Sequence, residues 1–430
     1  MAPDPQVLRV RWRDYHDGML QSAPPTLLVL FVAFLVAMPL VAFVSRRLRF
    51  PYTVGLVLVG LVVSALSIQD RPELSPELIV TILLPGLVFE AALRLDGDEL
   101  RRTFGGVALL AVPGVLVTAA VVAYMLHAAT GLPLGEAVLV GAIVSATDPV
   151  AVVATMRRLS APRRLVTLVD AESLFNDGTA ALLFVVALAA LGSTPPTPAE
   201  SVARFGVGLV GSVVIGALAG LLISRVLKAT SDHLIELTLT VLAAYGTYLV
   251  ADLLHLSGII ASVVAGIVLV TYGRRVGLSR HAQRAIDDVW EFLAFILTGA
   301  AFLLIGVSIP LQALAAAAMP IAWGVAAVLI GRAVVVYGLL GGVARLEQLI
   351  GIVPSLPTSF LHVMNWTGLR GAVATALALS IPETTPDREL LQGIVFGIVL
   401  FTLVVQGTTA DRVLRWAGVH AEAARAPLES

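Results

Sequence analysis

The chain has 430 residues, of which 58% are hydrophobic and only 13% are charged, and its mean hydropathy is +0.94. A soluble globular protein carries about 25% charged and about 45–50% apolar residues, so this composition excludes an ordinary soluble enzyme and indicates a membrane protein. With 28 basic and 29 acidic residues the net charge is −1, and without a basic excess we exclude nucleic-acid binding. The chain has no cysteine, which excludes disulfides, thiolate metal sites and cysteine nucleophiles.

Apolar runs long enough to cross a bilayer recur along the whole chain. A spanning helix needs about 20 mostly apolar residues, and polar or Pro/Gly-rich segments separate one run from the next. Thirteen runs fit this description, at 25–44, 53–68, 76–93, 104–128, 134–156, 164–191, 203–227, 233–253, 256–272, 288–308, 311–343, 358–381 and 388–411. We therefore predict an all-α polytopic membrane protein with thirteen transmembrane helices.

The segments outside these runs are short. We expect residues 1–24 to form an extracytoplasmic N-terminal segment, 25–411 the transmembrane domain, and 412–430 a short cytoplasmic tail. The first run lacks a small-residue cleavage site, so we interpret it as a retained helix and not as a signal peptide. The polar stretch from Gly277 to Asp288 is expected to be a solvated loop at the cytoplasmic face.

The distribution of Arg and Lys predicts the orientation, because basic residues collect in cytoplasmic loops. Twenty of the 28 basic residues follow runs 1, 3, 5, 7, 9 and 11 or lie in the tail: Arg46, Arg47, Arg49, Arg94, Arg101, Arg102, Arg157, Arg158, Arg163, Arg164, Arg225, Lys228, Arg274, Arg275, Arg280, Arg284, Arg345, Arg412, Arg415 and Arg425. Six lie on the opposite side, and the remaining two, Arg332 and Arg370, fall inside runs 11 and 12. This pattern predicts a multi-pass protein of the cell (inner) membrane with its N-terminus outside and its C-terminus in the cytoplasm.

Polar side chains inside the predicted helices mark the candidate site. An ionisable group at the centre of a spanning helix costs roughly 2.5–3.5 kcal/mol on insertion scales, so each one needs a partner or a water-filled cavity. These residues are Glu90 in run 3, Thr147 and Asp148 in run 5, Asp170, Glu172, Ser173, Asn176 and Asp177 in run 6, Arg332 in run 11 and Arg370 in run 12.

Run 5 contains its own helix breaker. In SATDPVAV, Pro149 lacks a backbone donor and disfavours helical geometry at Asp148, so the chain should unwind near Thr147 and free a carbonyl there. Unwound backbone in a bilayer is tolerated only beside protein or a cavity. A carbonyl, a Thr hydroxyl and a carboxylate are oxygen ligands that replace the hydration shell of a small cation. The alternative is a simple kink packed against its neighbours.

The spacing in run 6 separates its polar residues into two stripes. Asp170, Ser173 and Asp177 are three and four residues apart and share one helix face, whereas Glu172 and Asn176 lie about 100° away. We assign Asp177, with Ser173 one turn earlier, to an ion cavity facing run 5. Asp170, nearer the cytoplasmic end, is interpreted as a lone solvated carboxylate.

Glu172 faces a different neighbour in this interpretation. A buried carboxylate requires a buried cation, which is either Arg332 or Arg370. We therefore interpret Glu172 as one half of a structural ion pair.

Run 12 predicts a second interruption. Gly368 and Gly371 flank Arg370 at its midpoint, and paired glycines weaken a helix there. Runs 5 and 12 are seven runs apart. Because seven is an odd number of membrane crossings, two six-helix halves, runs 1–6 and 8–13, would insert with opposite orientation, and run 7 would link them. Inverted repeats whose broken helices meet at mid-membrane are typical of secondary transporters.

The chain resembles the NhaP-type sodium/proton antiporters, the family that also contains the animal Na+/H+ exchangers. The similarity runs from about Phe50 to Gly407 and includes PYTVGLVLVG at 51–60, LPGLVFEAAL at 84–93, SATDPVAVVA at 145–154, ESLFNDGTA at 172–180, WEFLAFILTGAAFLLIGVSI at 290–309, GLRGAVATALAL at 368–379 and FTLVVQGTT at 401–409. The most specific feature is TDP followed by ESxxND at this spacing.

The resemblance implies a thirteen-helix fold, a homodimer and a mobile core that holds two crossed helices. It implies that Asp177 and Asp148 are the ion and proton carboxylates, with Ser173, the Thr147 carbonyl and Glu90 completing or supporting the shell. The Na+ ion would accordingly lie at Asp148, Asp177, Ser173 and Thr147.

The resemblance also assigns supporting roles. Asn176 matches the family's Asn-Asp pair, which goes with electroneutral exchange, whereas an Asp-Asp pair marks electrogenic relatives. Glu172 would pair with Arg332, and Arg370 matches the arginine of the GLRG motif. The sequence departs from the family pattern in lacking a C-terminal extension, so regulation through a cytoplasmic domain is not carried over.

The predicted function is a secondary antiporter that exchanges cytoplasmic Na+ or Li+ for external H+, one for one, by alternating access. Ion and proton would compete for one carboxylate site, and inward protons would drive sodium out. A potassium/proton antiporter and a carrier for organic substrates are alternatives. A cation channel is weaker, because paired breaks favour alternating access. No Gly-rich phosphate loop or HExxH motif is present, so we expect neither an enzyme nor a cofactor.

Overall fold

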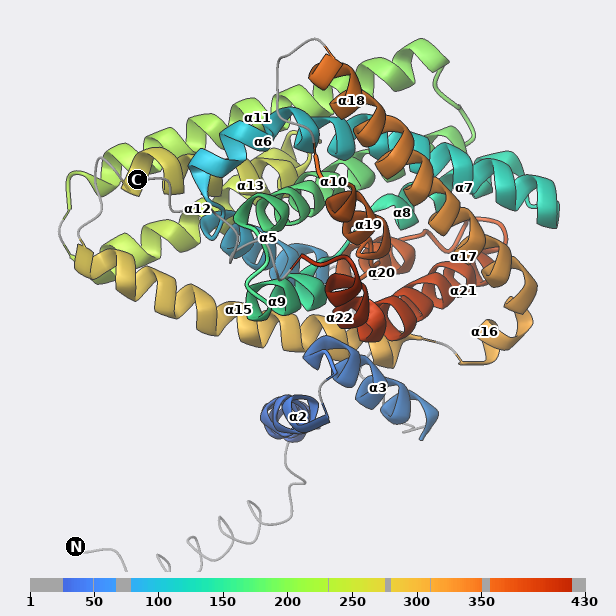
Figure 1. Cartoon of the computed structure of the whole chain (residues 1–430), viewed down its shortest axis with the longest axis horizontal. Helices are drawn as coiled ribbons and strands as arrows, with labels where there is room; N and C mark the ends of the chain where they lie inside the picture. The colour runs from blue at the N-terminus through green and yellow to red at the C-terminus, as the bar shows by residue number, and fades with distance from the viewer. Residues whose placement is uncertain are drawn as a thin grey trace, which may run out of the picture.

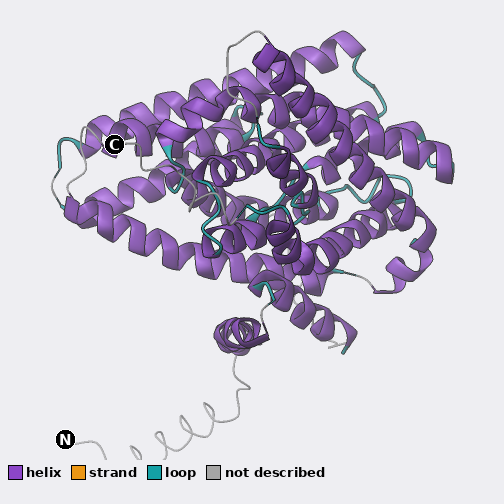
Figure 2. Ribbon diagram, viewed as in Figure 1, coloured by secondary structure: helices purple, strands orange, loops and turns teal. Residues whose placement is uncertain are grey.

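The computed structural model describes residues 26–48, 50–66, 79–230, 232–274, 280–309, 311–349 and 356–419. This part of the chain is helical and contains no strand (Figure 2). Its helices and π-helical turns are α2 (Thr26–Leu48), α3 (Tyr52–Ala65), η1 (Ile79–Leu83), α5 (Leu84–Leu93), α6 (Gly97–Leu109), η2 (Leu110–Gly114), α7 (Val115–Thr130), α8 (Leu134–Ser145), α9 (Val150–Arg158), α10 (Arg163–Ala190), α11 (Pro198–Leu227), α12 (His233–Leu253), α13 (Gly258–Val268), η3 (Leu269–Gly273), α15 (Arg280–Ser308), α16 (Leu311–Ala316), α17 (Ala318–Ala333), η4 (Val334–Leu340), α18 (Gly341–Leu349), α19 (Thr358–Trp366), α20 (Ala372–Leu379), α21 (Arg388–Phe401), η5 (Thr402–Gln406) and α22 (Gly407–Trp416).

The all-α membrane fold predicted from composition is confirmed. Within the described residues, nine helical segments are long and apolar enough to cross a membrane. Three shorter apolar helices, Tyr52–Ala65, Val80–Leu93 and Gly258–Gly273, accompany them. Helices occupy each of the thirteen predicted runs, while thirteen as the number of membrane crossings stays a prediction. The expected N-terminal segment 1–24 lies outside the described residues.

The helices pack as a bundle with the two interrupted segments at its centre. In Figure 1, α8, α10, α19 and α20 lie inside the molecule, α11 and α15 run along two of its edges, and α2 lies beside α3 at the lower margin. A close approach joins α3 to α15, where a Cβ built on Gly60 would come within 2.8 Å of the Gly306 Cα atom. Small residues allow such backbone contact, which drives helix association in membranes.

Both predicted helix interruptions are present. Helix α8 ends at Ser145 and α9 begins at Val150, so residues 146–149 are not helical. Helix α19 ends at Trp366 and α20 begins at Ala372, so residues 367–371 are not helical. We call these segments break 1 and break 2. Their positions agree with the Pro149 and paired-glycine predictions.

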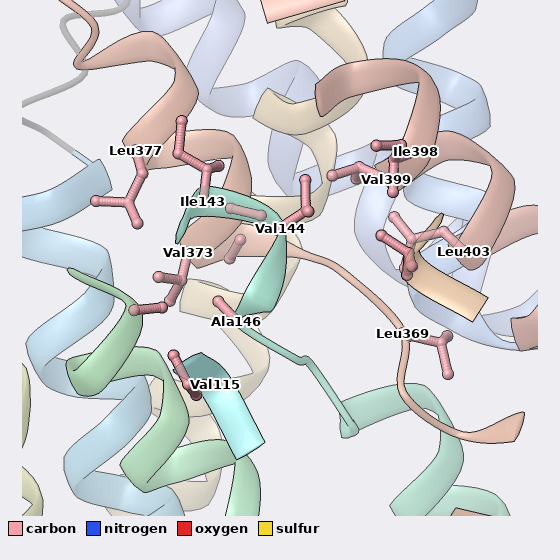
Figure 3. Close-up of a cluster of buried hydrophobic side chains, with 14 of the residues drawn as sticks. Val115, Ile143, Val144, Ala146, Leu369, Val373, Leu377, Ile398, Val399 and Leu403 are labelled. Atoms are coloured by element: carbon pink, nitrogen blue, oxygen red, sulfur yellow. The ribbon is translucent and has the colours of Figure 1, made fainter. Parts of the chain in front are cut away.

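Apolar side chains enclose the two breaks. Figure 3 shows Ala146 of break 1 and Leu369 of break 2 among side chains from α8, α20 and α21, including Val144 and Val399. All four residues belong to one buried hydrophobic cluster. The unwound backbone is therefore buried in protein, as the absence of water from a bilayer requires.

One predicted loop is wrong. The polar stretch expected to be a loop at 277–288 is helical from Arg280 onwards, because α15 begins there and continues to Ser308. Its apolar residues recur at helical spacing, which a mean hydropathy over the stretch does not detect. Helix α22 continues to Trp416, and the end of the last membrane span at 411 stays a prediction.

Candidate ion-binding site

The two breaks are hydrogen-bonded to each other. The Asp148 backbone N–H donates to the Leu369 carbonyl at 2.8 Å, and the Ala372 N–H donates to Oδ2 of Asp148 at 3.4 Å. Oδ1 of Asp148 accepts the Val150 N–H at 3.1 Å. The carboxylate thus lies at the N-terminal ends of both α9 and α20, where the helix dipoles favour negative charge.

Gly371 makes this contact possible. A Cβ atom built on Gly371 would collide with the Asp148 carboxylate. Only a residue without a side chain allows the backbone of break 2 to approach the acidic group so closely. The glycine predicted to weaken the helix is therefore also the glycine that admits Asp148.

Asn176 and Ser173 of α10 hold break 1 from the opposite side. The Asn176 Oδ1 atom accepts the Thr147 N–H at 3.2 Å, and its Nδ2 group donates to the Thr147 hydroxyl at 2.6 Å. The Ser173 hydroxyl donates to the Thr147 carbonyl. The carbonyl freed by Pro149 is therefore already in contact with a second predicted ligand, and it keeps one lone pair available.

A cavity of about 360 Å³ brings together the five residues predicted to bind the ion and proton: Glu90, Thr147, Asp148, Ser173 and Asp177. The side chains of Asp148 and Asp177 are half-buried, whereas Thr147 and Ser173 are buried. The cavity extends to Arg94 and Arg157, at the ends of α5 and α9. It therefore connects the breaks with the end of the bundle that carries these arginines.

The far end of this cavity contains charged groups that sequence reasoning missed. Asp170, which we predicted to be a lone solvated carboxylate, instead accepts a hydrogen bond from Arg157 at 3.1 Å, and that prediction is wrong. Glu90 forms an ion pair with Arg94 one turn later on α5. The spacing of four residues between Glu90 and Arg94 could have revealed their ion pair. The pair of Arg157 and Asp170 joins α9 to α10, so it depends on how these helices pack.

The predicted structural ion pair of Glu172 is present and its partner is Arg332. Both side chains are buried, and Nη2 of Arg332 donates to Oε2 of Glu172 at 3.0 Å. The same guanidinium donates to the Met364 carbonyl from Nε at 3.1 Å and from Nη2 at 2.9 Å. Arg332 therefore joins α10 and α17 to the helical turn that precedes break 2.

Arg370 supports break 1 from within break 2. Its side chain is 1% exposed, and its Nε group donates to the Val144 carbonyl at 2.7 Å. Its Nη1 group donates to the Gly368 carbonyl, and its backbone N–H donates to the Thr402 hydroxyl at 3.0 Å. These bonds satisfy carbonyl groups that the two interruptions leave without helical partners.

The oxygen set suits a hard cation. No group of three or more His, Asp or Glu side chains able to hold a metal ion is present among the described residues. The cavity offers two carboxylates, of Asp148 and Asp177, together with the neutral oxygens of Thr147 and Ser173. Oxygen ligands of this kind coordinate hard cations.

Buried helix interruptions, a cavity with two carboxylates and an internal ion pair are features of multi-pass membrane transport proteins. Residues 30–416 match the family described as "Sodium/hydrogen exchanger, transmembrane", and the chain belongs to this family.

Curated relatives and a solved structure agree with this membership. The chain is 38% identical to the low-affinity Na+/H+ antiporter NhaS1 of Synechocystis sp. over 379 residues, which cover 85% of this chain and 69% of that protein. It is 32% identical to the Na+/H+ antiporter NhaP of Pseudomonas aeruginosa, over 90% of this chain and 96% of that one. The fold is similar to that of the sodium proton antiporter MjNhaP1 from Methanocaldococcus jannaschii, with a TM-score of 0.74, 20% identity, and coverage of 91% and 99% of the two chains.

Proposed function

We propose that this sodium/hydrogen exchanger moves Na+ or Li+ out of the cytoplasm in exchange for external H+, one ion for one proton. The observation that carries the proposal is the cavity that ends at both Asp148 and Asp177. A carboxylate reached from one side of the membrane accepts either a proton or a metal cation. It cannot hold both on the same oxygens, so the two substrates compete.

The assigned ligands are those that line the cavity at the breaks. Na+ binds to the carboxylates of Asp148 and Asp177, to the Ser173 hydroxyl and to the Thr147 carbonyl. Because Ser173 already contacts that carbonyl, the two neutral oxygens lie close enough to share one ion. Glu90 supports the site from α5, as part of the lining of the same cavity.

The charges around the breaks favour electroneutral exchange. Glu172 and Arg332 neutralise each other, and Asn176 carries no charge. The carboxylates of Asp148 and Asp177 carry two negative charges and the buried guanidinium of Arg370 in break 2 carries one positive charge, which leaves one net negative charge. One Na+ or one H+ cancels that charge, so either substrate brings the core to the same neutral state.

Alternating access follows if the core moves only when neutral. Moving an unpaired charge through the low-dielectric interior is costly, whereas a neutralised site moves at little electrostatic cost. The cavity leads toward Arg94 and Arg157, which the distribution of basic residues places at the cytoplasmic side. The described conformation is therefore inward-facing in this proposal.

The proposal includes the arrangement in the membrane. The protein resides in the inner membrane with its N-terminus outside and its C-terminus in the cytoplasm, with residues 25–411 as the transport domain and 412–430 as a short tail. It acts as a homodimer, as the family resemblance implies. Cysteine labelling from each side tests the orientation, and the cysteine-free chain accepts single probes without a background.

The test of the function uses purified protein in liposomes. Collapse of an imposed proton gradient is measured on adding Na+, Li+ or K+ in turn. We expect Na+ and Li+ to collapse the gradient and K+ to leave it unchanged. Collapse by K+ alone would identify a potassium/proton antiporter, and cation conductance without proton movement would identify a channel.

The stoichiometry is tested by clamping the membrane potential with K+ and valinomycin. A one-for-one exchange moves no net charge, so the rate should be the same at 0 and at −100 mV. A rate that follows the voltage would contradict the charge balance assigned to Arg370 and Asn176.

A further inference from the structure

A second cavity of about 470 Å³ lies beside the ion cavity. Its walls come from α2, the start of α3, α9, α15 and α22, and the polar residues among them are Ser45, Arg46, Tyr52, Thr53, Thr155, Arg158, Thr408 and Asp411. Its apolar wall includes Phe50 and Ala154. No role in ion exchange has been assigned to this cavity.

An aromatic pair separates the two cavities. Tyr52 and Phe295 line both of them, and their rings stack with centroids 5.4 Å apart at an angle of 13°. Helix α9 also contributes Val150 and Ala154 to both. The second cavity therefore lies next to the ion cavity and shares part of its wall.

The charges at the second cavity are mostly positive. The Asp411 carboxylate accepts from Arg158 at 3.2 Å and from Arg415 at 2.9 Å, so one acid is shared by two guanidinium groups. Arg46 lines the cavity, and it forms no ion pair or hydrogen bond within the described part of the chain. This excess of positive charge repels a cation and attracts an anion.

Two buried hydroxyl oxygens of residues at this cavity, in Tyr52 and Thr53, also lack a partner within the described part of the chain. Thr53 is 3% exposed, and its Oγ1 atom makes no hydrogen bond to any described residue. Leaving a buried polar group unpaired costs about 1–3 kcal/mol. A ligand with oxygen acceptors would relieve this cost and would also pair with the guanidinium of Arg46.

We propose that the second cavity binds a phosphate-bearing anion, with Arg46 and Arg158 as its cationic partners and Thr53 as a hydroxyl donor. Guanidinium groups suit phosphate because their N–H groups match its oxygens in pairs. The same chemistry is offered by the headgroup of an anionic phospholipid and by free inorganic phosphate. Bound there, the anion joins α2 and α3 to α9, the helix that continues from Asp148.

Two neighbouring arginines provide a matched test. Both side chains are exposed, but Arg46 lines the cavity, whereas Arg47, the next residue on α2, is not part of the wall. Thermal unfolding of the detergent-purified full chain is measured with phosphatidylglycerol or phosphatidylcholine, and with inorganic phosphate or chloride at equal ionic strength. A ligand that binds only the folded state raises the midpoint of unfolding. We expect a phosphate-bearing anion to raise it by about 2 °C or more relative to its matched control lipid or salt.

Arg46→Gln should lose at least half of that rise, and Arg47→Gln should keep it. A rise with phosphatidylglycerol alone identifies a lipid headgroup, and a rise with inorganic phosphate as well identifies free phosphate as sufficient. Equal losses in the two variants would overturn the proposal in favour of a diffuse surface charge. No rise in the wild type with either phosphate source would also overturn it.

Thr53→Val provides a second variant that does not alter charge. It removes the unpaired hydroxyl and keeps the side-chain shape, so the protein without ligand should be at least as stable as the wild type. The ligand-dependent rise should nevertheless fall. If the ligand raised the unfolding midpoint of this variant as much as that of the wild type, Thr53 would not be a ligand of the anion. Since the readout is binding, these outcomes do not depend on whether the exchanger carries Na+ or K+.

Discussion

Break 1 and break 2 solve the same structural problem with opposite charges. Each interrupts a buried helix, and each supplies a side chain that pairs with backbone beside the other break: Asp148 accepts the Ala372 N–H, and Arg370 donates to the Val144 carbonyl. The acid nevertheless lies at a cavity and is half-buried, while Arg370 is 1% exposed and its guanidinium donates to two backbone carbonyls.

This difference means that the Asp148 carboxylate can exchange its bound partner, whereas the Arg370 guanidinium cannot. A carboxylate beside water can bind and release a cation or a proton. A guanidinium enclosed by carbonyl groups stays charged and fixed, because removing it from its partners would leave several buried groups unpaired. We therefore assign the binding of the transported ion and proton to Asp148 of break 1 together with Asp177. We assign permanent compensation of their negative charge to Arg370 of break 2.

The largest effect is expected at Asp177. Asp177→Asn removes the carboxylate that alternates between Na+ and H+, so exchange in proteoliposomes should be abolished. The side chain keeps its size and lies at a cavity, so the midpoint of thermal unfolding should change little. Retention of wild-type turnover would show that the competing site lies elsewhere.

The contact between the breaks is tested at Gly371. A Cβ there collides with the Asp148 carboxylate, and such overpacking typically costs about 1–3 kcal/mol. Since 1.4 kcal/mol corresponds to a factor of ten, Gly371→Ala should lower the exchange rate about tenfold or more. Gly105→Ala is the control, because a Cβ at that helical position meets nothing within 4 Å. Equal rates for the two variants would contradict the proposed contact.

The ion pair beside break 2 should matter for stability more than for turnover. Glu172→Gln leaves the Arg332 guanidinium buried without its counter-ion, and breaking a buried pair typically costs about 3–5 kcal/mol. We expect a lower unfolding midpoint, with exchange per folded molecule largely retained. If the variant kept its stability but lost exchange, Glu172 would act in transport and not as a structural ion-pair partner.

The smallest effect is expected at the far end of the cavity. Asp170 and Asp177 lie on the same face of α10, but Asp170 pairs with Arg157, and the two side chains are 17% and 45% exposed. Ion pairs at the surface contribute roughly 0–1 kcal/mol, and this pair is partly screened because Arg157 is open to solvent. Asp170→Asn should therefore keep both exchange and stability close to wild type, and it is the matched control for Asp177→Asn. If Asp170→Asn lost as much exchange activity as Asp177→Asn, the transport site would include the whole α10 face from Asp170 to Asp177.

The sequence predicts the breaks well because their causes are local. Pro149 cannot continue a helix, and Gly368 and Gly371 weaken one, whatever surrounds them. The separation of Glu172 from Asp177 also follows from helical spacing alone. These features needed no knowledge of the packing.

Contacts between distant segments were not predictable in the same way. The bonds from Asp148 to Leu369, from Arg370 to Val144 and from Arg157 to Asp170 each join two segments. Spacing identifies the face of a helix on which a residue lies, but the packing of the bundle decides what meets that face. For the same reason, residue composition alone could not have located the second cavity.

The central claim is that one site holds either a proton or a sodium ion. It is tested most directly by adding Na+ to the purified protein in a weakly buffered solution and following a pH indicator. The account predicts that binding releases about one proton per Na+ bound, and that Asp177→Asn releases none. Sodium binding without proton release in the wild type would contradict it.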